Sequence, residues 1–125
     1  MFREVASVAV LVNDAKKAAE WYQEKLGFEV DSMRGHWVAV KPTGSKTILH
    51  LCAKCEEWGS DSPGGKTGIF LATEDKEKTY RELKAKGVEF AKELTTESFG
   101  TYAIFKDLDG NELWIWKIPT EKSPD

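Results

Sequence analysis

Side chains that could do chemistry are concentrated in the segment TILHLCAKC, which contains His50, Cys52 and Cys55. Imidazole and thiolate groups are zinc ligands, and two thiols three residues apart can also form a redox pair. A closed zinc site needs a fourth ligand, and the only other histidine is His36. Redox pairs of the thioredoxin kind lie at a helix N-terminus, whereas this segment alternates like a strand. The residues therefore favour a buried thiol beside a polar side chain, and His50 and Cys52 are the candidates if a metal is bound.

Length and charge exclude several function classes. The chain has 125 residues and a formal charge of −3, and its charged residues of both signs are interspersed, so it lacks the basic footprint of a nucleic-acid-binding protein. Its apolar N-terminal run is too short to span a membrane and has no signal-peptide features. We therefore expect a cytoplasmic protein with no nucleic-acid or membrane partner. In that compartment a structural disulfide is not expected.

The elements that position these residues occur twice in the sequence. Residues 7–30 resemble residues 68–90, because both contain an apolar strand, an acidic cap, a helix, a glycine and a second strand. Residues 36–44 likewise resemble residues 101–110, and each of these segments precedes a further strand. The repeating unit is therefore predicted to be β-α-β-β-β.

Local signals support both predicted helices. Asp14 and Asp75 are placed to cap the helix N-termini by accepting hydrogen bonds from free backbone amides. Gly27 and Gly87 suit the left-handed position where a helix ends.

The repeat predicts an α+β fold in which tandem βαβββ modules form an incomplete barrel with a concave cleft. We expect one domain over residues 1–125. Its modules span about residues 4–55 and 66–118, joined by a linker at about 56–65 and followed by a tail at 119–125.

Acidic residues in the second module are interpreted as structural. Glu93 and Glu97 are expected in a solvated loop before the seventh strand. Asp107 and Asp109 are expected to form a turn, because aspartate side chains bond to nearby backbone amides. No catalytic residue is assigned, since Ser7 and His50 lack an identified carboxylate partner.

Two motifs carry a family resemblance. The segment from Val10 to Phe28, with its WY pair and terminal LGF, and the segment DLDGNELWIW resemble the vicinal oxygen chelate superfamily of glyoxalase I, bleomycin-resistance proteins and extradiol dioxygenases. This resemblance implies four metal-ligand positions facing the cleft in metal-dependent members. They fall on Ser7, His50, Gly68 and Trp114, of which only His50 can hold a metal.

Tryptophans occupy the last strand where the family places a carboxylate. Trp114 and Trp116 are predicted to share the cleft face, with Leu113 and Ile115 behind them. Their indoles either fill the cleft or form an aromatic wall for a planar or cationic small molecule. The predicted ligand-contacting residues are Ser7, His50, Gly68, Phe70, Trp114 and Trp116.

The resemblance implies a small-molecule-binding protein without a cofactor, closest to the bleomycin-resistance branch, which would confer antibiotic resistance by sequestration. The alternative is a metal-dependent lyase, isomerase or dioxygenase that uses His50 with zinc, nickel, manganese or iron. A homodimer is expected, because family members commonly pair and open sheets leave exposed edges.

Overall fold

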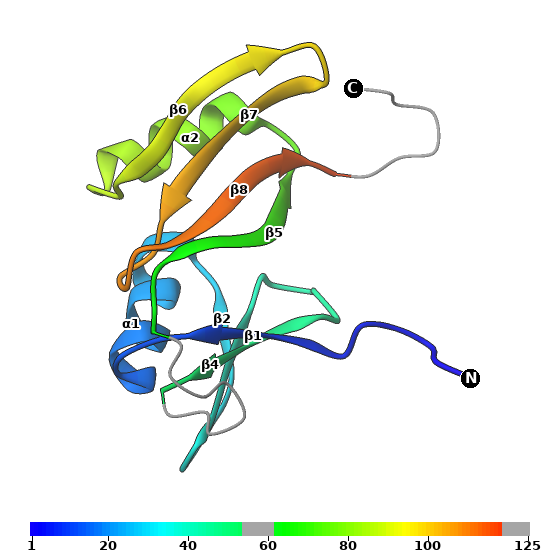
Figure 1. The fold of residues 1–125 in the computed structure, drawn as a ribbon, viewed down its shortest axis with the longest axis vertical. Coiled ribbons are helices and arrows are strands. Elements are labelled where there is room, and N and C mark those ends of the chain that lie inside the picture. Colours follow the sequence, from blue (N-terminus) through cyan, green and yellow to red (C-terminus); the bar gives the residue numbers. More distant parts are fainter. Residues whose placement is uncertain (54–61, 119–125) are drawn as a thin grey trace. The chain divides into compact units, whose positions relative to one another are not determined.

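The computed structural model describes residues 1–53 and 62–118, and its chain divides into two units, Met1–Gly64 and Gly65–Asp125. Each unit has the order strand, helix and three strands, as Figure 1 shows. The expected tandem βαβββ arrangement and α+β class are confirmed. In the described residues, no helix is long and apolar enough to span a membrane.

The first unit packs one helix on a mixed sheet. Its elements are β1 (Ser7–Leu11), α1 (Ala15–Leu26), β2 (Glu29–Arg34), β3 (Trp37–Lys41) and β4 (Ile48–Cys52). The strand order is β1-β4-β3-β2, and β1 is parallel to β4 while the other neighbours are antiparallel. A parallel neighbour requires a long crossover connection, and α1 lies within it.

The core of the first unit follows from its apolar periodicity. Ala18, Ala19 and Tyr22 on α1 are completely buried. Alternate residues of the strands, such as Val10 and Leu51, are also buried, which identifies the sheet face that α1 covers. Asp14 accepts a hydrogen bond from the backbone amide of Lys17 at 3.1 Å, so the predicted N-cap is confirmed.

The second unit repeats this plan with longer strands. Its elements are β5 (Gly65–Thr73), α2 (Lys76–Ala85), β6 (Phe90–Glu97), β7 (Gly100–Lys106) and β8 (Asn111–Lys117). The strand order is β5-β8-β7-β6, with β5 parallel to β8 and the other neighbours antiparallel. Leu113 and Ile115 of β8 are buried on the face where α2 packs, as alternation predicts.

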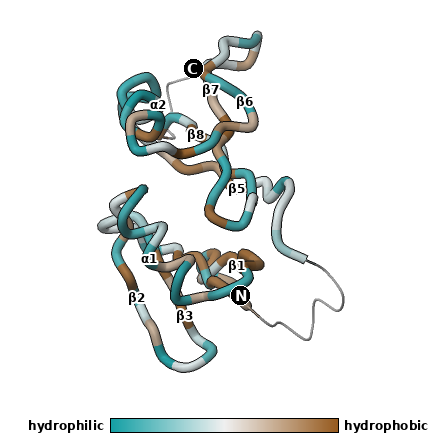
Figure 2. The backbone as a smooth tube through the Cα atoms, turned by 90° about the vertical axis from the view of Figure 1, so that its left-hand side faces the viewer, coloured by the Kyte–Doolittle hydropathy of each residue, from teal (hydrophilic) through white to brown (hydrophobic). Residues whose placement is uncertain are grey.

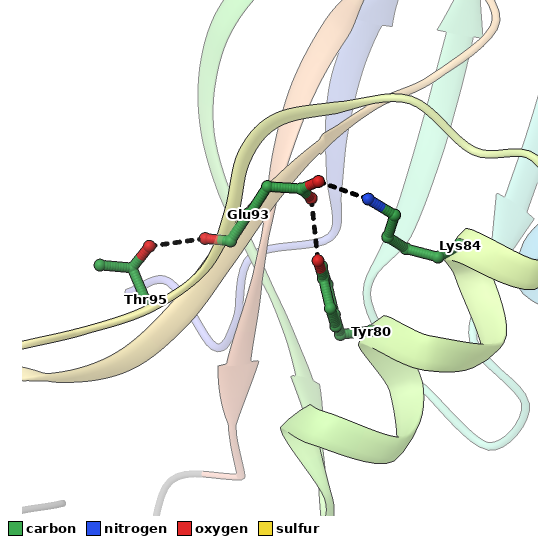
Figure 3. Close-up of polar contacts among 4 residues, drawn as sticks. All are labelled: Tyr80, Lys84, Glu93 and Thr95. Atoms are coloured by element: carbon green, nitrogen blue, oxygen red, sulfur yellow. Dashed lines mark hydrogen bonds and ion pairs between the residues drawn. The ribbon is translucent and has the colours of Figure 1, made fainter.

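Helix α2 is more polar than α1, and Figure 2 shows it in largely hydrophilic colours. Leu83 is its buried residue, and polar contacts add to the attachment. Tyr80 donates a hydrogen bond at 3.0 Å to Oε2 of Glu93 on β6, while Lys84 forms an ion pair with the other oxygen, as Figure 3 shows. The hydrogen bond with Lys84 lowers the pKa of Glu93, and the same contact raises the pKa of Lys84. These side chains therefore link the helix to the edge strand.

The position of Glu93 corrects the sequence interpretation. Glu93 and Glu97 lie within β6 and not in a loop, because β6 continues to Glu97 and pairs with β7. Register irregularities on either side of Lys92 interrupt the simple alternation along β6. A strand whose side-chain alternation is interrupted is difficult to recognise from the sequence.

The turn between β7 and β8 is built around a buried carboxylate. Asp107 Oδ1 accepts hydrogen bonds from the backbone amides of Asp109 and Asn111, each at 2.9 Å. Its Oδ2 accepts a third, from the side-chain amide of Asn111 at 3.0 Å. The prediction that Asp107 forms this turn is confirmed, and the turn sets the pairing of β7 with β8.

Candidate functional site

Five aromatic side chains form a continuous group on the sheet face of the second unit opposite α2. We call Phe70, Phe99, Tyr102, Trp114 and Trp116 the aromatic cluster. Trp114 lies between two nearly parallel rings, with centroid distances of 4.5 Å to Phe70 and 4.5 Å to Tyr102. Phe99 continues this stack from Tyr102 at 5.3 Å. The rings therefore belong to one packed array.

Trp116 lies beside the stack and contacts the rings at both of its ends. Its ring contacts Phe70 in an edge-on geometry at 6.0 Å and Phe99 at 6.2 Å. Phe70 and Phe99 are 49% and 53% exposed, so the cluster presents apolar surface to solvent at both ends of the stack. Contiguous exposed aromatic surface of this kind marks binding sites more often than isolated exposed residues do.

Strand register explains why these rings meet. Phe70 on β5 is directly opposite Trp114 on β8. Trp114 is opposite Ile104 on β7, so Tyr102, two residues away, projects from the same face. Buried Leu113 and Ile115 hold the other face of β8 against the core. Both indoles are therefore directed away from α2, as the sequence predicts.

Gly68 lies where β5 departs from regular pairing. The register of β5 against β8 shifts between Lys66 and Ile69, and Gly68 has a φ of 74°. The Thr67 hydroxyl stabilises this bulge by donating to the carbonyl of Glu112 at 2.6 Å and accepting from the amide of Ile69 at 3.1 Å. A left-handed residue in a bulge favours glycine. The bulge therefore explains why a glycine occupies position 68. The predicted contact between Gly68 and a ligand stays a prediction.

Two lysine ammonium groups lie over rings of the aromatic cluster. Lys92 Nζ is 5.4 Å from the ring centroid of Tyr102, and Lys76 Nζ is 5.2 Å from that of Trp116. A hydrogen bond with the Tyr102 side chain raises the pKa of Lys92, and Glu97, whose carboxylate is 3.8 Å from Lys92 Nζ, adds to this effect. Lys92 is therefore a stable cation at the border of the cluster.

The first unit places its predicted site residues on its own open face. Ala9 on β1, His50 on β4, Ala39 on β3 and Ser32 on β2 lie side by side across the sheet. Trp37 covers the His50 ring at a centroid distance of 4.0 Å. His50 Nε2 is buried and has no hydrogen-bond partner among residues 1–53 and 62–118.

The remaining first-unit candidate is Ser7, which is exposed on β1. It lies two residues before Ala9, the residue paired with His50, and therefore on the same sheet face. The structure thus brings Ser7 and His50 to one face of the first sheet, and Phe70, Trp114 and Trp116 to one face of the second.

The four family positions offer few donors for a metal ion. Ser7, His50, Gly68 and Trp114 supply a hydroxyl, an imidazole, no side chain and an indole. In the described part of the chain, no three His, Cys, Asp or Glu side chains gather closely enough to hold an ion. Divalent metals in proteins generally require three or more protein ligands of these kinds. Of these four positions, only His50 has a side chain of a kind that commonly binds metals.

Cys52 requires a correction. It is buried on β4, as expected, but it is disulfide-bonded, so the expectations of a free thiol and of no disulfide are wrong at this residue. A sulfur in a disulfide is not a thiolate, and this removes Cys52 from the candidate zinc ligands while the bond is intact. Cys55 lies outside the described residues.

Sequence inspection missed several members of the site. Tyr102 could have been found from its alternation with Ile104, once the pairing of β7 with β8 was known. Phe99 lies in the turn between β6 and β7, where no period exists to place it. The lysine positions depend on side-chain contacts that spacing does not encode.

Comparison with known proteins identifies the family. The sequence profile of the Glyoxalase/Bleomycin resistance protein/Dioxygenase superfamily matches residues 4–115. The Bacillus subtilis protein YetH is 37% identical over 116 residues, which cover 89% of this chain and 95% of YetH.

Solved structures agree with this assignment. A superfamily member from Sphaerobacter thermophilus is 32% identical with a TM-score of 0.81, and the match covers 94% of this chain and 98% of that protein. TnmS3, an antibiotic binding protein from Streptomyces sp. CB03234, is 29% identical with a TM-score of 0.81 and the same coverage, 94% and 98%. The chain therefore belongs to the Glyoxalase/Bleomycin resistance protein/Dioxygenase superfamily.

Proposed function

We propose that this protein is a non-enzymatic, metal-free binding protein that holds a planar, partly aromatic small molecule against the aromatic cluster. The observation that carries the proposal is the stack of Phe70, Trp114 and Tyr102, which continues to a second half-exposed ring, Phe99. Stacking on aromatic rings and burial of apolar area are favourable for a planar ligand. The similarity to TnmS3 supports this class of function.

The exposed rings favour a binding surface over a filled core. A core built only to exclude solvent buries its aromatic rings, as Phe105 on the opposite face is buried, with 1% exposure. Phe70 and Phe99 keep about half of their surface exposed. A ligand that covers these two rings removes apolar area from water without requiring the stack to open.

Sequestration is the mode of action that such a site supports. Tight binding lowers the free concentration of a toxic compound without changing it chemically, and protection then depends on the amount of protein. In a sensitive bacterial host, resistance conferred by this protein should therefore rise with its expression level. Recovery of the compound unaltered from the cells would separate sequestration from enzymatic modification.

A fluorescence titration tests the proposed binding. We choose three anthracene probes, an anthracene carboxylate, anthracenemethanol and aminomethylanthracene, because anthracene accepts excitation energy from nearby tryptophan. Energy transfer should saturate for at least one probe, and Trp114→Ala should weaken its binding about tenfold, since a stacking partner is lost. Trp21→Phe on α1 is the matched control and should bind like the unaltered protein. Equal affinity in Trp114→Ala, or no binding of any probe, would overturn the proposal.

A metal-dependent lyase, isomerase or dioxygenase is the second candidate, and one observation favours it. The buried Nε2 of His50 lacks a hydrogen-bond partner among the described residues, as an unoccupied ligand atom would. Elemental analysis of protein purified without chelators distinguishes the two candidates. Stoichiometric metal that is lost in His50→Ala would support the enzyme and contradict the metal-free binding protein.

A further inference from the structure

The aromatic cluster is bordered by positive charge. Lys92 approaches Tyr102 from β6, and Lys76 approaches Trp116 from the first residue of α2. Each ammonium already makes a cation–π contact with a ring of the cluster. A cationic ligand would therefore have to compete with one of the protein's own ammonium groups for the Tyr102 and Trp116 rings.

In the described part of the second unit, this face has charged side chains of both signs, with one more lysine than glutamate. Glu112 shares the face of Trp114, and the register places it between Lys66 on β5 and Lys106 on β7. Register and ring contacts place four lysines and three glutamates on this face: Lys66, Lys76, Lys92, Lys106, Glu89, Glu97 and Glu112. The whole chain has a net charge of −3, whereas this face has a surplus of one positive charge.

The neighbouring acidic group Glu93 does not offset this charge. Glu93 is engaged on the helix side of the sheet by Tyr80 and Lys84, as Figure 3 shows. Glu97 is 3.8 Å from Lys92 Nζ, a distance at which it tempers the charge of the ammonium without enclosing it. Lys92 keeps 42% of its side-chain surface exposed, so a bound ligand can reach it.

We propose that the ligand of the aromatic cluster is a planar aromatic anion, with its carboxylate, sulfonate or phenolate group beside Lys92 or Lys76 and its ring system on Phe70 or Phe99. This inference rests on the proposed function and narrows the earlier expectation of a planar or cationic molecule. An anion gains an ion pair with an ammonium that the cluster already positions. A cation of the same shape meets repulsion from both lysines.

The three anthracene probes test the charge preference directly, because they share one ring system. The carboxylate should bind about tenfold more tightly than the amine, with the alcohol between them, since an exposed charge pair changes affinity by a factor of about two to five and two lysines contribute. Added salt should weaken the binding of the carboxylate probe and leave the affinity of the alcohol probe nearly unchanged.

Lysine variants locate the effect. Lys92→Met and Lys76→Met keep the apolar stem. The variant that removes the lysine beside the anionic group should weaken carboxylate binding about two- to fivefold, and both should change alcohol binding less than twofold. Lys78→Met is the matched control, because Lys78 is exposed on α2 and no ring contact places it at the cluster. It should leave both affinities unchanged.

The outcomes separate this inference from the proposed function. If all three probes bind equally, or the amine binds best, the anion preference is wrong while the aromatic binding site stands. The same holds if both lysine variants keep full carboxylate affinity. If none of the three probes binds, the proposed function itself fails.

Discussion

Removal of the Asp107 carboxylate should destabilise the second unit and disturb the aromatic cluster. Asp107 is 6% exposed and accepts three hydrogen bonds of 2.9, 2.9 and 3.0 Å. Hydrogen bonds to a charged group contribute about 1.5–3 kcal/mol each but are not additive, so Asp107→Ala should lower the free energy of unfolding by about 3–5 kcal/mol. Asp107→Asn keeps one acceptor oxygen and should lose about half as much.

Urea unfolding followed by circular dichroism measures this loss. Asp31→Ala is the matched control, because Asp31 forms a surface ion pair with Lys41, at 3.7 Å, and its removal should cost less than about 1 kcal/mol. The turn also sets the register that stacks Tyr102 on Trp114, so Asp107→Ala should bind the anthracene probes more weakly. If Asp107→Ala is no less stable than Asp31→Ala, the stabilising role assigned to this carboxylate is refuted.

Two further predictions concern the helices. The contact with Lys84 lowers the pKa of Glu93 below its ordinary value of 4.5. The ionised Glu93 side chain therefore stabilises the folded protein above pH 4.5, and this stabilisation is lost as the pH falls through the lowered pKa. Glu93→Gln should therefore be less stable than the unaltered protein at pH 7 and equal to it in acid, and a difference that does not depend on pH would contradict this. Gly27 ends α1 at a φ of 70° in open space, so Gly27→Ala should cost about 1 kcal/mol through backbone strain alone. A calorimetric midpoint equal to that of the unaltered protein would show that no strain exists.

Much of the fold can be predicted because its signals are local. The repeat and both aspartate N-caps depend on spacings that sequence alone displays. The common face of Trp114 and Trp116 also follows from period-two alternation on β8. These features need no knowledge of which strands pair.

The missed features depend on pairing or on irregular backbone. The stack of Tyr102 on Trp114 requires the register of β7 against β8, and Phe99 joins it from a turn. Gly68 lies in a bulge that shifts alternation along β5, and register irregularities likewise obscured β6. Dimerisation, cytoplasmic location and the ligand contacts of the site residues stay predictions.

The most direct test is a nuclear magnetic resonance titration that follows the indole N–H signals of the tryptophans as anthracene carboxylate is added. Signals are assigned with single tryptophan-to-phenylalanine variants. If the ligand binds the aromatic cluster, the signals of Trp114 and Trp116 shift and saturate together, while that of Trp21 on α1 stays in place. Saturable binding that leaves the Trp114 and Trp116 signals unmoved would contradict a ligand site on the aromatic cluster.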